Sequence, residues 1–286
     1  MSVERDNQRF LNILSRFLNF EDDAISPSDV DAVSAVGVDR SYAFSLLLAE
    51  RYGVDVENAD RRFFNDYFLP SVKNLKAEDY YSDEYYKYID FTEETFGDFK
   101  LTKLSVKPCQ AFVRDDFAYY PDGRVVPLIG FFDKEYTYPA VLQGGREWMT
   151  LLPNEINSQL KYIGAASGNV LTYGLGLGYY VLKVALKSDV RSVTVVDIDQ
   201  KVIDLFSRNI LSKFPEFAKS KVRLVNADAL QFAKNLKGSR FDYVYADIWR
   251  DVSDGLDLYK ALKQTEVFSP GSRFGYWIED TMKYYL

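Results

Sequence analysis

Apolar residues over the first 92 positions recur at the spacing of α-helices. Between residues 10 and 18, phenylalanines and leucines return every three or four positions, which places them on one helical face. The run Ser26-Pro27-Ser28-Asp29 combines a cap, a proline and an acid in the order that begins a helix. Further helices are predicted over residues 42–52 and 58–68, which end close to a glycine and a proline. We therefore predict a helical amino-terminal region over residues 1–92.

Alternation of apolar and polar residues replaces this spacing after residue 92. The run Phe99–Val106 largely alternates, as a half-buried strand does. Further strands are predicted over residues 125–132 and 136–142, after the turn Pro121-Asp122-Gly123. Residues 93–150 are therefore predicted to form a small antiparallel β layer.

Residues 151–286 carry the pattern of a parallel α/β domain. The apolar run Val170–Tyr173 leads into a glycine turn, and a helix is predicted to follow over residues 179–187. Three more short apolar runs with an acidic residue at or just after their ends are predicted as strands: 193–196, 222–225 and 243–246. Because the carboxyl ends of neighbouring parallel strands share one edge of the sheet, these glycines and acids mark a binding cleft.

The spacing of the glycines narrows the choice of ligand. Gly174, Gly176 and Gly178 occupy the first, third and fifth positions of the turn, whereas the dinucleotide fingerprint has its last glycine at the sixth, which is Tyr179 here. No lysine follows in the pattern of a phosphate-binding loop. We therefore expect a nucleoside ligand without a phosphate chain.

Composition excludes several other classes of function. The net charge of −7 argues against a nucleic-acid partner, which requires a basic footprint. The chain has no histidine and a single cysteine, Cys109, so we expect no internal disulfide, no metal site and no histidine-based catalysis. The start of the chain lacks a secretory apolar core, and no apolar run approaches bilayer length. The expectation is a soluble cytoplasmic protein with no membrane partner.

Four motifs together support a resemblance to a known family. They are Gly174-x-Gly176-x-Gly178, Val196-Asp197-Ile198-Asp199, Asn226-Ala227-Asp228-Ala229 and the run from Phe241 to Asp247. In this order they resemble the class I S-adenosylmethionine-dependent methyltransferases, over roughly residues 95–280. The second motif, and the strand-rich segment before the glycine turn, are more similar to the spermidine synthase branch of that superfamily. The resemblance implies a Rossmann-like methyltransferase fold that binds S-adenosyl-L-methionine.

The resemblance assigns cofactor binding to residues along the strand ends: Gly174, Gly176, Gly178, Asp197, Ile198, Asp228, Ala229 and Asp247. The glycines would let the backbone approach the ribose and the methionine part of the cofactor. Asp197 would accept hydrogen bonds from the ribose hydroxyls, since a carboxylate is an acceptor-only group. Asp228 would accept from the adenine amino group, and Ala229 would leave room for the ring.

Asp247 is also the predicted catalytic residue, which would orient a substrate amine or hydroxyl and serve as the base if one is needed. Candidates for the substrate pocket are Glu147, Trp148, Glu155 and Trp249, with Asn154 at the rim. A purely structural role for two of these residues is equally open: Trp148 would pack in a core, and Glu155 would stabilise the start of a helix. Asp251 is expected to cap the next helix.

Departures from the family pattern leave the reaction open. Thr172 stands where many methyltransferases have an acid, and Leu177 where spermidine synthases have an aspartate. After Asp247 the chain has Ile248-Trp249-Arg250, so the second carboxylate of a spermidine synthase is missing from its usual place. The leading hypothesis is therefore methyl transfer from S-adenosylmethionine to a small molecule. The alternatives are aminopropyl transfer and a non-catalytic nucleoside-binding protein.

The carboxyl end predicts a shortened sheet. One helix over residues 254–263 and one strand over residues 273–278 use most of the 39 residues after Asp247, which leaves no room for the last helix and hairpin of a seven-stranded sheet. Either the sheet stops at five strands, or the antiparallel layer covers its edge. Because an uncovered edge strand can pair with another chain, a homodimer is possible.

Overall fold

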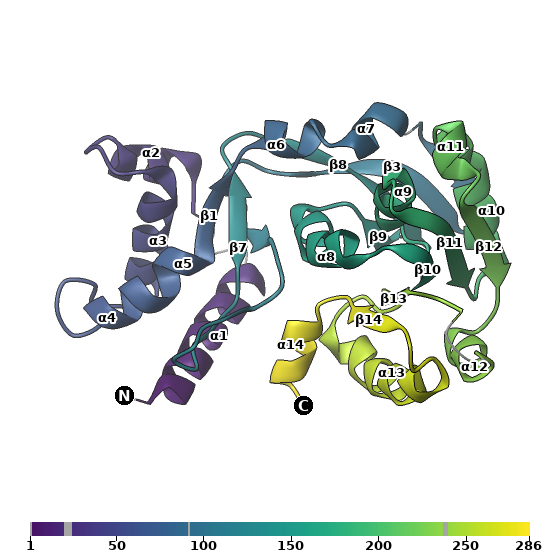
Figure 1. Cartoon of the computed structure of the whole chain (residues 1–286). Coiled ribbons are helices and arrows are strands. Elements are labelled where there is room, and N and C mark those ends of the chain that lie inside the picture. The colour runs from purple at the N-terminus through teal and green to yellow at the C-terminus, as the bar shows by residue number, and fades with distance from the viewer. Residues whose placement is uncertain (1, 20–24, 91, 237–239) are drawn as a thin grey trace. The chain divides into compact units, whose positions relative to one another are not determined.

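The computed structural model describes residues 2–19, 25–90, 92–236 and 240–286 of the chain (Figure 1). Contacts divide the chain into two compact units, and each is interrupted in sequence. The amino-terminal unit comprises residues 1–81 and 105–137, and the carboxyl-terminal unit comprises residues 82–104 and 138–286. The two units are defined by contacts in space, whereas the predicted parts 1–92, 93–150 and 151–286 are defined by their type of secondary structure. Because the two divisions use different criteria, the predicted domain boundaries stay a prediction.

The amino-terminal unit packs helices against a small sheet. Its helices are α1 (Val3–Asn19), α2 (Pro27–Ser34), α3 (Arg40–Arg51), α4 (Arg61–Phe63), the π-helical segment η2 (Phe64–Phe68), α5 (Leu69–Ser71) and α6 (Ala77–Tyr81). Its strands are β1 (Val72–Leu75), β4 (Phe112–Val113), β5 (Ala118–Tyr119), β6 (Val125–Val126) and β7 (Ile129–Phe132). The order β1-β7-β4 forms one sheet, and β5 pairs with β6. The predicted helical character of this region is confirmed, although the helix expected over residues 58–68 is divided into α4, η2 and α5.

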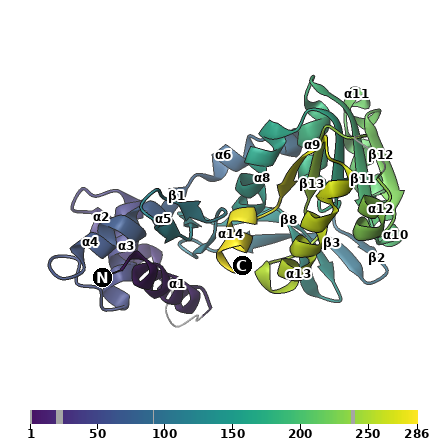
Figure 2. The same cartoon turned by 60° about the horizontal axis from the view of Figure 1, so that its bottom comes forward.

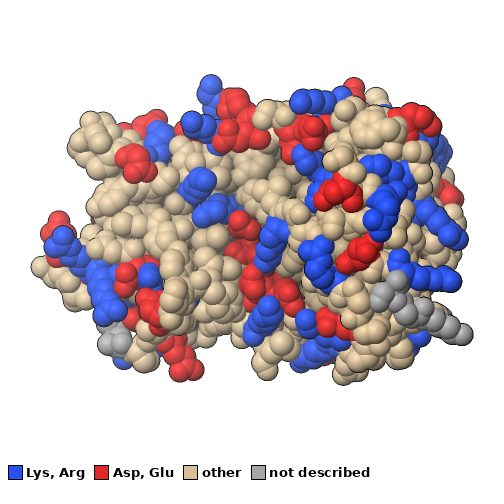
Figure 3. Space-filling view, in the orientation of Figure 1, with Lys and Arg blue, Asp and Glu red and all other residues tan. Residues whose placement is uncertain are grey.

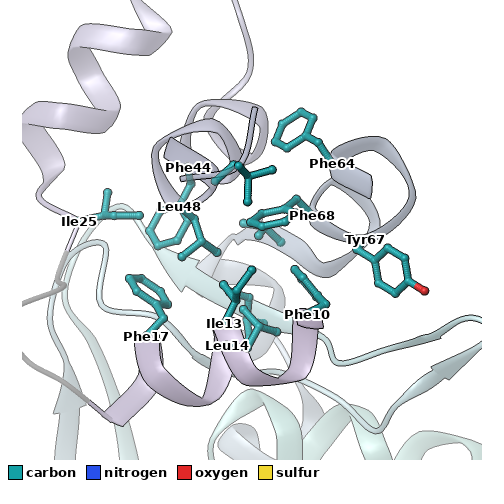
Figure 4. Close-up of a cluster of buried hydrophobic side chains, with 14 of the residues drawn as sticks. Phe10, Ile13, Leu14, Phe17, Ile25, Phe44, Leu48, Phe64, Tyr67 and Phe68 are labelled. Atoms are coloured by element: carbon teal, nitrogen blue, oxygen red, sulfur yellow. The ribbon is translucent and has the colours of Figure 1, made fainter. Parts of the chain in front are cut away.

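Aromatic side chains form the core of this unit. Figure 4 shows Phe10 and Phe17 of α1 facing side chains of α3 and η2. The rings of Phe10 and Phe68 lie 4.9 Å apart in an edge-to-face arrangement, which is favourable for aromatic pairs. The start of α2 follows the sequence pattern, because Ser26 and Asp29 cap each other's backbone amides reciprocally.

A five-stranded parallel sheet forms the centre of the carboxyl-terminal unit. Its strands, in the order β12-β11-β10-β13-β14, are Val222–Asn226, Val190–Asp197, Gly168–Tyr173, Tyr243–Ala246 and Arg273–Tyr276. A second sheet has the order β2-β3-β8-β9, with the strands Glu94–Phe96, Phe99–Val106, Tyr136–Gln143 and Arg146–Thr150. In this second sheet β2 pairs antiparallel with β3, and β8 pairs antiparallel with β9.

Helices cover the parallel sheet in two groups. They are α7 (Glu84–Tyr88), α8 (Pro153–Ala165), α9 (Tyr179–Leu186), α10 (Gln200–Asn209), the 3-10 turn η3 (Leu211–Lys213), α11 (Glu216–Lys219), α12 (Ala229–Lys234), α13 (Val252–Thr265), the 3-10 turn η4 (Glu266–Phe268) and α14 (Glu279–Tyr284). In Figure 1, α8 and α9 lie on one side of β13 and β14, and α13 and α14 lie on the other. Figure 2 shows α10 and α12 beside the end of the sheet that carries β12. The predicted Rossmann-like α/β fold is confirmed.

Strand order determines where a ligand can bind. The chain starts the sheet at its middle strand, β10, then adds β11 and β12 on one side and β13 and β14 on the other. The crevice at the carboxyl ends of such strands, where the order reverses, is the usual binding site of open parallel sheets.

The end of the chain departs in part from the prediction. The sheet has five strands within the described residues, which is one of the two alternatives, but a further helix, α14, follows. The strand β14 ends at Tyr276 instead of residue 278, which leaves room for that helix. None of the described helices is both long and apolar enough to cross a membrane.

Candidate functional site

A cavity of about 660 Å³ lies at the carboxyl ends of β10, β11, β12 and β13, within the carboxyl-terminal unit. Every residue that the sequence assigned to cofactor or substrate binding lines it: Glu147, Trp148, Glu155, Gly174, Gly176, Gly178, Asp197, Ile198, Asp228, Ala229, Asp247 and Trp249. Asn154, expected at the rim, is not among the lining residues. The structure therefore brings the predicted residues together, while the role of each stays a prediction.

The three glycines of the turn are needed for different reasons. A Cβ atom on Gly174 would lie 2.0 Å from the backbone carbonyl oxygen of Asp247, so only glycine lets β10 and β13 approach this closely. A Cβ atom on Gly178 would lie 2.5 Å from the ring of Phe206, so this glycine lets α9 pack on α10. Gly176 faces open space and is exposed, so it is the turn glycine that leaves the backbone accessible to a ligand.

Asp197, at the end of β11, is hydrogen-bonded to the glycine turn. One carboxylate oxygen accepts the backbone amide of Leu175 at 3.2 Å, and the other accepts that of Asp199 at 3.0 Å. Burial raises the pKa of Asp197, although these amides favour its charged form. Each oxygen has a second lone pair, so the carboxylate can still accept hydrogen bonds from a ligand.

Residues before the β layer support the glycine turn from behind. The hydroxyl of Tyr85, a fully buried residue, donates to the carbonyl oxygen of Leu177 at 2.5 Å. Asp83 accepts from the hydroxyl of Tyr179 and from the amine of Lys183, both at 3.1 Å. Sequence reasoning missed this support, because nothing in the local pattern of α7 points to a partner 92 residues away.

The residues predicted to lie beside the adenine ring also have structural roles. Asp228 caps α12 by accepting the amide of Gln231 at 2.8 Å, which leaves its second oxygen for other donors. Ala229 begins α12, and Ile198 is 70% exposed at the rim of the cavity. We refer to Gly174–Gly178, Asp197 and Asp228 as the glycine-turn side of the cavity.

Glu155, Gln159 and Asp247 form the opposite, acid-pair side. Glu155 and Gln159 lie on α8 one turn apart, and the side-chain amide of Gln159 donates to Oδ2 of Asp247 at 3.1 Å. Burial raises the pKa of Glu155 well above its ordinary value, and the charge of Asp247 raises it further. Burial also raises the pKa of Asp247, to about 7. The two carboxyl groups thus interact electrostatically at the cavity wall.

Aromatic residues complete the wall. Trp249 is buried and packs edge-to-face on Tyr259, with ring centroids 6.2 Å apart. Trp148 is half-buried against Phe99, and Glu147 is exposed at the rim. Glu155 lines the cavity and also occupies the first turn of α8. It therefore has both of the positions that the sequence analysis considered for it, one in the pocket and one at a helix start. Asp251 caps α13 in a capping box with Asp254, as expected.

Several lining residues were not found from the sequence. Gln159, Tyr180 and Tyr245 line the cavity, although the sequence analysis assigned none of them to the site. Trp277, which follows β14, also lines the cavity. Glu279 accepts a hydrogen bond from the hydroxyl of Tyr259 at 2.8 Å and is not among the lining residues. A signal for Gln159 was present, since it follows Glu155 by four positions on the same predicted helix face.

The lining is strongly acidic. It carries six carboxyl groups, from Glu147, Glu155, Asp197, Asp228, Asp247 and Asp254. Among the described residues that line it, Arg250 is the single base, and it pairs with Asp254 at 3.2 Å. Elsewhere acidic and basic side chains are interspersed, as on the face in Figure 3. An excess of negative charge in a partly closed cavity favours a cationic ligand.

Known proteins match the carboxyl-terminal part of the chain. Residues 153–265 match the family described as "Spermine/spermidine synthase domain". Polyamine aminopropyltransferase 2 of Caldanaerobacter subterraneus subsp. tengcongensis is 39% identical over 100 residues, which cover 32% of this chain and 33% of that protein. The chain therefore spans about a third of the length of this curated relative.

Two solved structures match part of the chain at low sequence identity. Spermidine synthase from Thermotoga maritima is 15% identical, with 52% of this chain and 59% of that chain covered and a TM-score of 0.34. The methyltransferase domain of bacterial CtHen1 is 16% identical, with 38% and 60% covered and a TM-score of 0.29. The resemblance of this chain to the spermidine synthase branch of the class I S-adenosylmethionine-dependent methyltransferase superfamily is confirmed, with the family match at residues 153–265.

Proposed function

We propose that the chain transfers an aminopropyl group from decarboxylated S-adenosylmethionine to an amine nitrogen of a polyamine. The sequence favoured methyl transfer and kept aminopropyl transfer as the alternative. The match to the spermine/spermidine synthase family supports that alternative, whereas methyl transfer is supported only at the level of the fold. The donor is then a substrate that is consumed.

The observation that carries the proposal is the charge of the cavity. Decarboxylated S-adenosylmethionine bears a sulfonium and an ammonium group and no carboxylate. S-adenosylmethionine would bring a carboxylate among six acidic side chains, with Arg250 already paired to Asp254. Since like charges in a cavity disfavour binding, the lining selects the decarboxylated donor and a cationic acceptor.

The donor is proposed to lie on the glycine-turn side. The exposed backbone at Gly176 lets the nucleoside approach, and Asp197 accepts its ribose hydroxyls. The second oxygen of Asp228 accepts the adenine amino group beside Ala229. The close approach of Gly174 to Asp247 then brings the sulfonium end next to the acid pair.

Asp247 is proposed as the general base. A polyamine nitrogen enters as an ammonium and gives one proton to Asp247, whose raised pKa, about 7, suits proton exchange at neutral pH. The neutral nitrogen attacks the aminopropyl carbon bonded to sulfur. The carbon–sulfur bond breaks, its electron pair stays on sulfur, and methylthioadenosine leaves. The protein mainly aligns the two reactants and excludes water.

Glu155 supplies the second carboxyl group of the proposed site. A spermidine synthase has it after the fourth strand, where this chain has Ile248-Trp249-Arg250. Glu155 comes from α8 instead, and its burial, together with the charge of Asp247, raises its pKa. Entry of a cation between the two groups would favour the ionised form of both.

A transfer assay tests the proposal. Purified full-length chain is incubated with a linear diamine and either decarboxylated S-adenosylmethionine or S-adenosylmethionine, and products are identified by mass spectrometry. An aminopropylated amine with methylthioadenosine is the expected result. A methylated product with S-adenosylhomocysteine overturns the proposal in favour of methyl transfer. Binding of either compound without product over a panel of amines favours a non-catalytic protein.

A further inference from the structure

We infer that Gln159 selects the acceptor, because its side-chain carbonyl takes a hydrogen bond from the reacting nitrogen while its amide group holds Asp247. The inference rests on the proposed function and adds a specificity-determining residue to it. Gln159 is not part of the motifs from which the site was predicted, and it lies on α8 at a position that lines the cavity.

One contact fixes the orientation of the Gln159 side chain. Its Nε2 donates to Oδ2 of Asp247 at 3.1 Å, and a carboxylate oxygen is an acceptor, so the nitrogen must face Asp247. The carbonyl oxygen Oε1 belongs to the same planar amide group. It is therefore held beside the carboxylate that is proposed to take the proton.

That carbonyl oxygen lacks a hydrogen-bond partner among the described residues. Gln159 is 5% exposed, and its Oε1 is buried and accepts no hydrogen bond from any described residue. A buried acceptor without a donor has lost its hydration and gains no hydrogen bond in return. A ligand that brings a donor to this point recovers that loss, so the oxygen favours a ligand with a suitably placed N–H or O–H group.

A count of hydrogens decides which nucleophile fits. The reacting atom must give one hydrogen to Asp247 and hold a second toward Oε1 of Gln159. A primary ammonium has three hydrogens and a secondary ammonium two, so both satisfy the two acceptors. A hydroxyl group, or an ammonium with two N-methyl groups, has one hydrogen and leaves one acceptor unpaired. The site thus discriminates against alcohols and N,N-dimethylated amines.

The test compares Gln159→Met with wild-type chain. Methionine has a similar size and flexibility but cannot donate or accept as an amide does. The matched control is Gln200→Met, because Gln200 makes the same kind of amide-to-carboxylate bond, to Asp204 at 2.8 Å, on the exposed face of α10. Affinities for diaminobutane and its N,N,N′,N′-tetramethyl derivative, which has one hydrogen on each ammonium group, are measured by calorimetry with methylthioadenosine bound. KM and kcat are measured where turnover occurs.

We expect wild-type chain and Gln200→Met to prefer diaminobutane over its tetramethyl derivative at least about fivefold, as one unpaired acceptor predicts. Gln159→Met should lose most of this preference while it binds methylthioadenosine normally, which shows that it is folded. An unchanged preference in Gln159→Met overturns the inference. If wild-type chain binds the diamine but transfers nothing, the proposed function fails while the binding comparison still decides on Gln159. If wild-type chain binds no amine, both proposals fail.

Discussion

The two sides of the cavity are built in different ways. On the glycine-turn side the ligand-facing groups are largely backbone, held by the strand order and by contacts such as Gly174 against the carbonyl of Asp247. On the acid-pair side they are side chains from α8 and from the end of β13, which meet through one hydrogen bond between Gln159 and Asp247. The first side is fixed by the fold, whereas the second depends on a few exchangeable side chains.

This difference separates what the fold shares from what the reaction requires. A backbone cradle suits any nucleoside with a sulfonium, so it is compatible with methyl or aminopropyl transfer. In the proposed function, the side chains of the acid-pair side select the nucleophile and accept its proton. Changes on the two sides should therefore affect different measurements.

The largest separation is expected for Asp247→Asn. Removal of a general base lowers kcat/KM for the amine by about 10²–10⁴-fold, while methylthioadenosine binding should stay near the wild-type value. In wild-type chain, Asp247 is protonated below its raised pKa, so kcat/KM should fall as pH drops below about 7. The variant should lose the part of this profile that belongs to Asp247. Comparable loss of nucleoside binding would show that the two sides are not separable.

Gly174→Ala should damage both sides, because this glycine is where they touch. The added Cβ would lie 2.0 Å from a backbone oxygen, at a residue with a φ of +94°. We expect a loss of about 3 kcal/mol or more of folding stability, seen in the melting temperature, and weak nucleoside binding. Gly37→Ala is the control, since Gly37 has the same φ of +94° but nothing lies within 4 Å of its Cβ. Equal effects of the two substitutions would contradict the steric explanation.

Tyr85→Phe should give the smallest effect, confined to the glycine-turn side. It removes the hydroxyl that donates to the carbonyl of Leu177 and keeps the ring that fills the core. Loss of one hydrogen bond, about 1 kcal/mol, predicts a fivefold weaker affinity for methylthioadenosine in calorimetry, at roughly unchanged KM for the amine. Tyr88→Phe, on the exposed part of α7, should change neither value. A larger change in KM for the amine than in nucleoside affinity would argue against a support role.

The sequence predicted the glycine-turn side well, because its groups lie in short motifs at strand ends. Gly174, Asp197 and Asp228 each follow an apolar run, and strand order brings such ends together. The acid-pair side was recognised only in part. Glu155 and Asp247 were both named, but their interaction depends on how α8 packs near β13. Gln159 and Asp247, for example, are hydrogen-bonded although they are 88 residues apart. A contact between residues so far apart leaves no periodic signal in the sequence.

The same reason explains why methyl transfer was favoured. The carboxylate missing after Asp247 is a difference at one position of a sequence motif. In the folded chain, a second carboxyl group can instead come from another helix or strand. Glu155 lies on a helix before the glycine turn, so the comparison of motifs alone did not count it.

The support of the glycine turn by Tyr85 and Asp83 has a consequence for fragments of this protein. Residues 82–104 fold with residues 138–286, so the compact unit that holds the cavity is assembled from two separate stretches of the chain. A fragment that starts at residue 93 or 151 would contain every glycine and acid of the motifs, yet it would lack the hydroxyl beneath Leu177 and the carboxylate beside Lys183. During synthesis, these supporting residues leave the ribosome long before the turn that they hold.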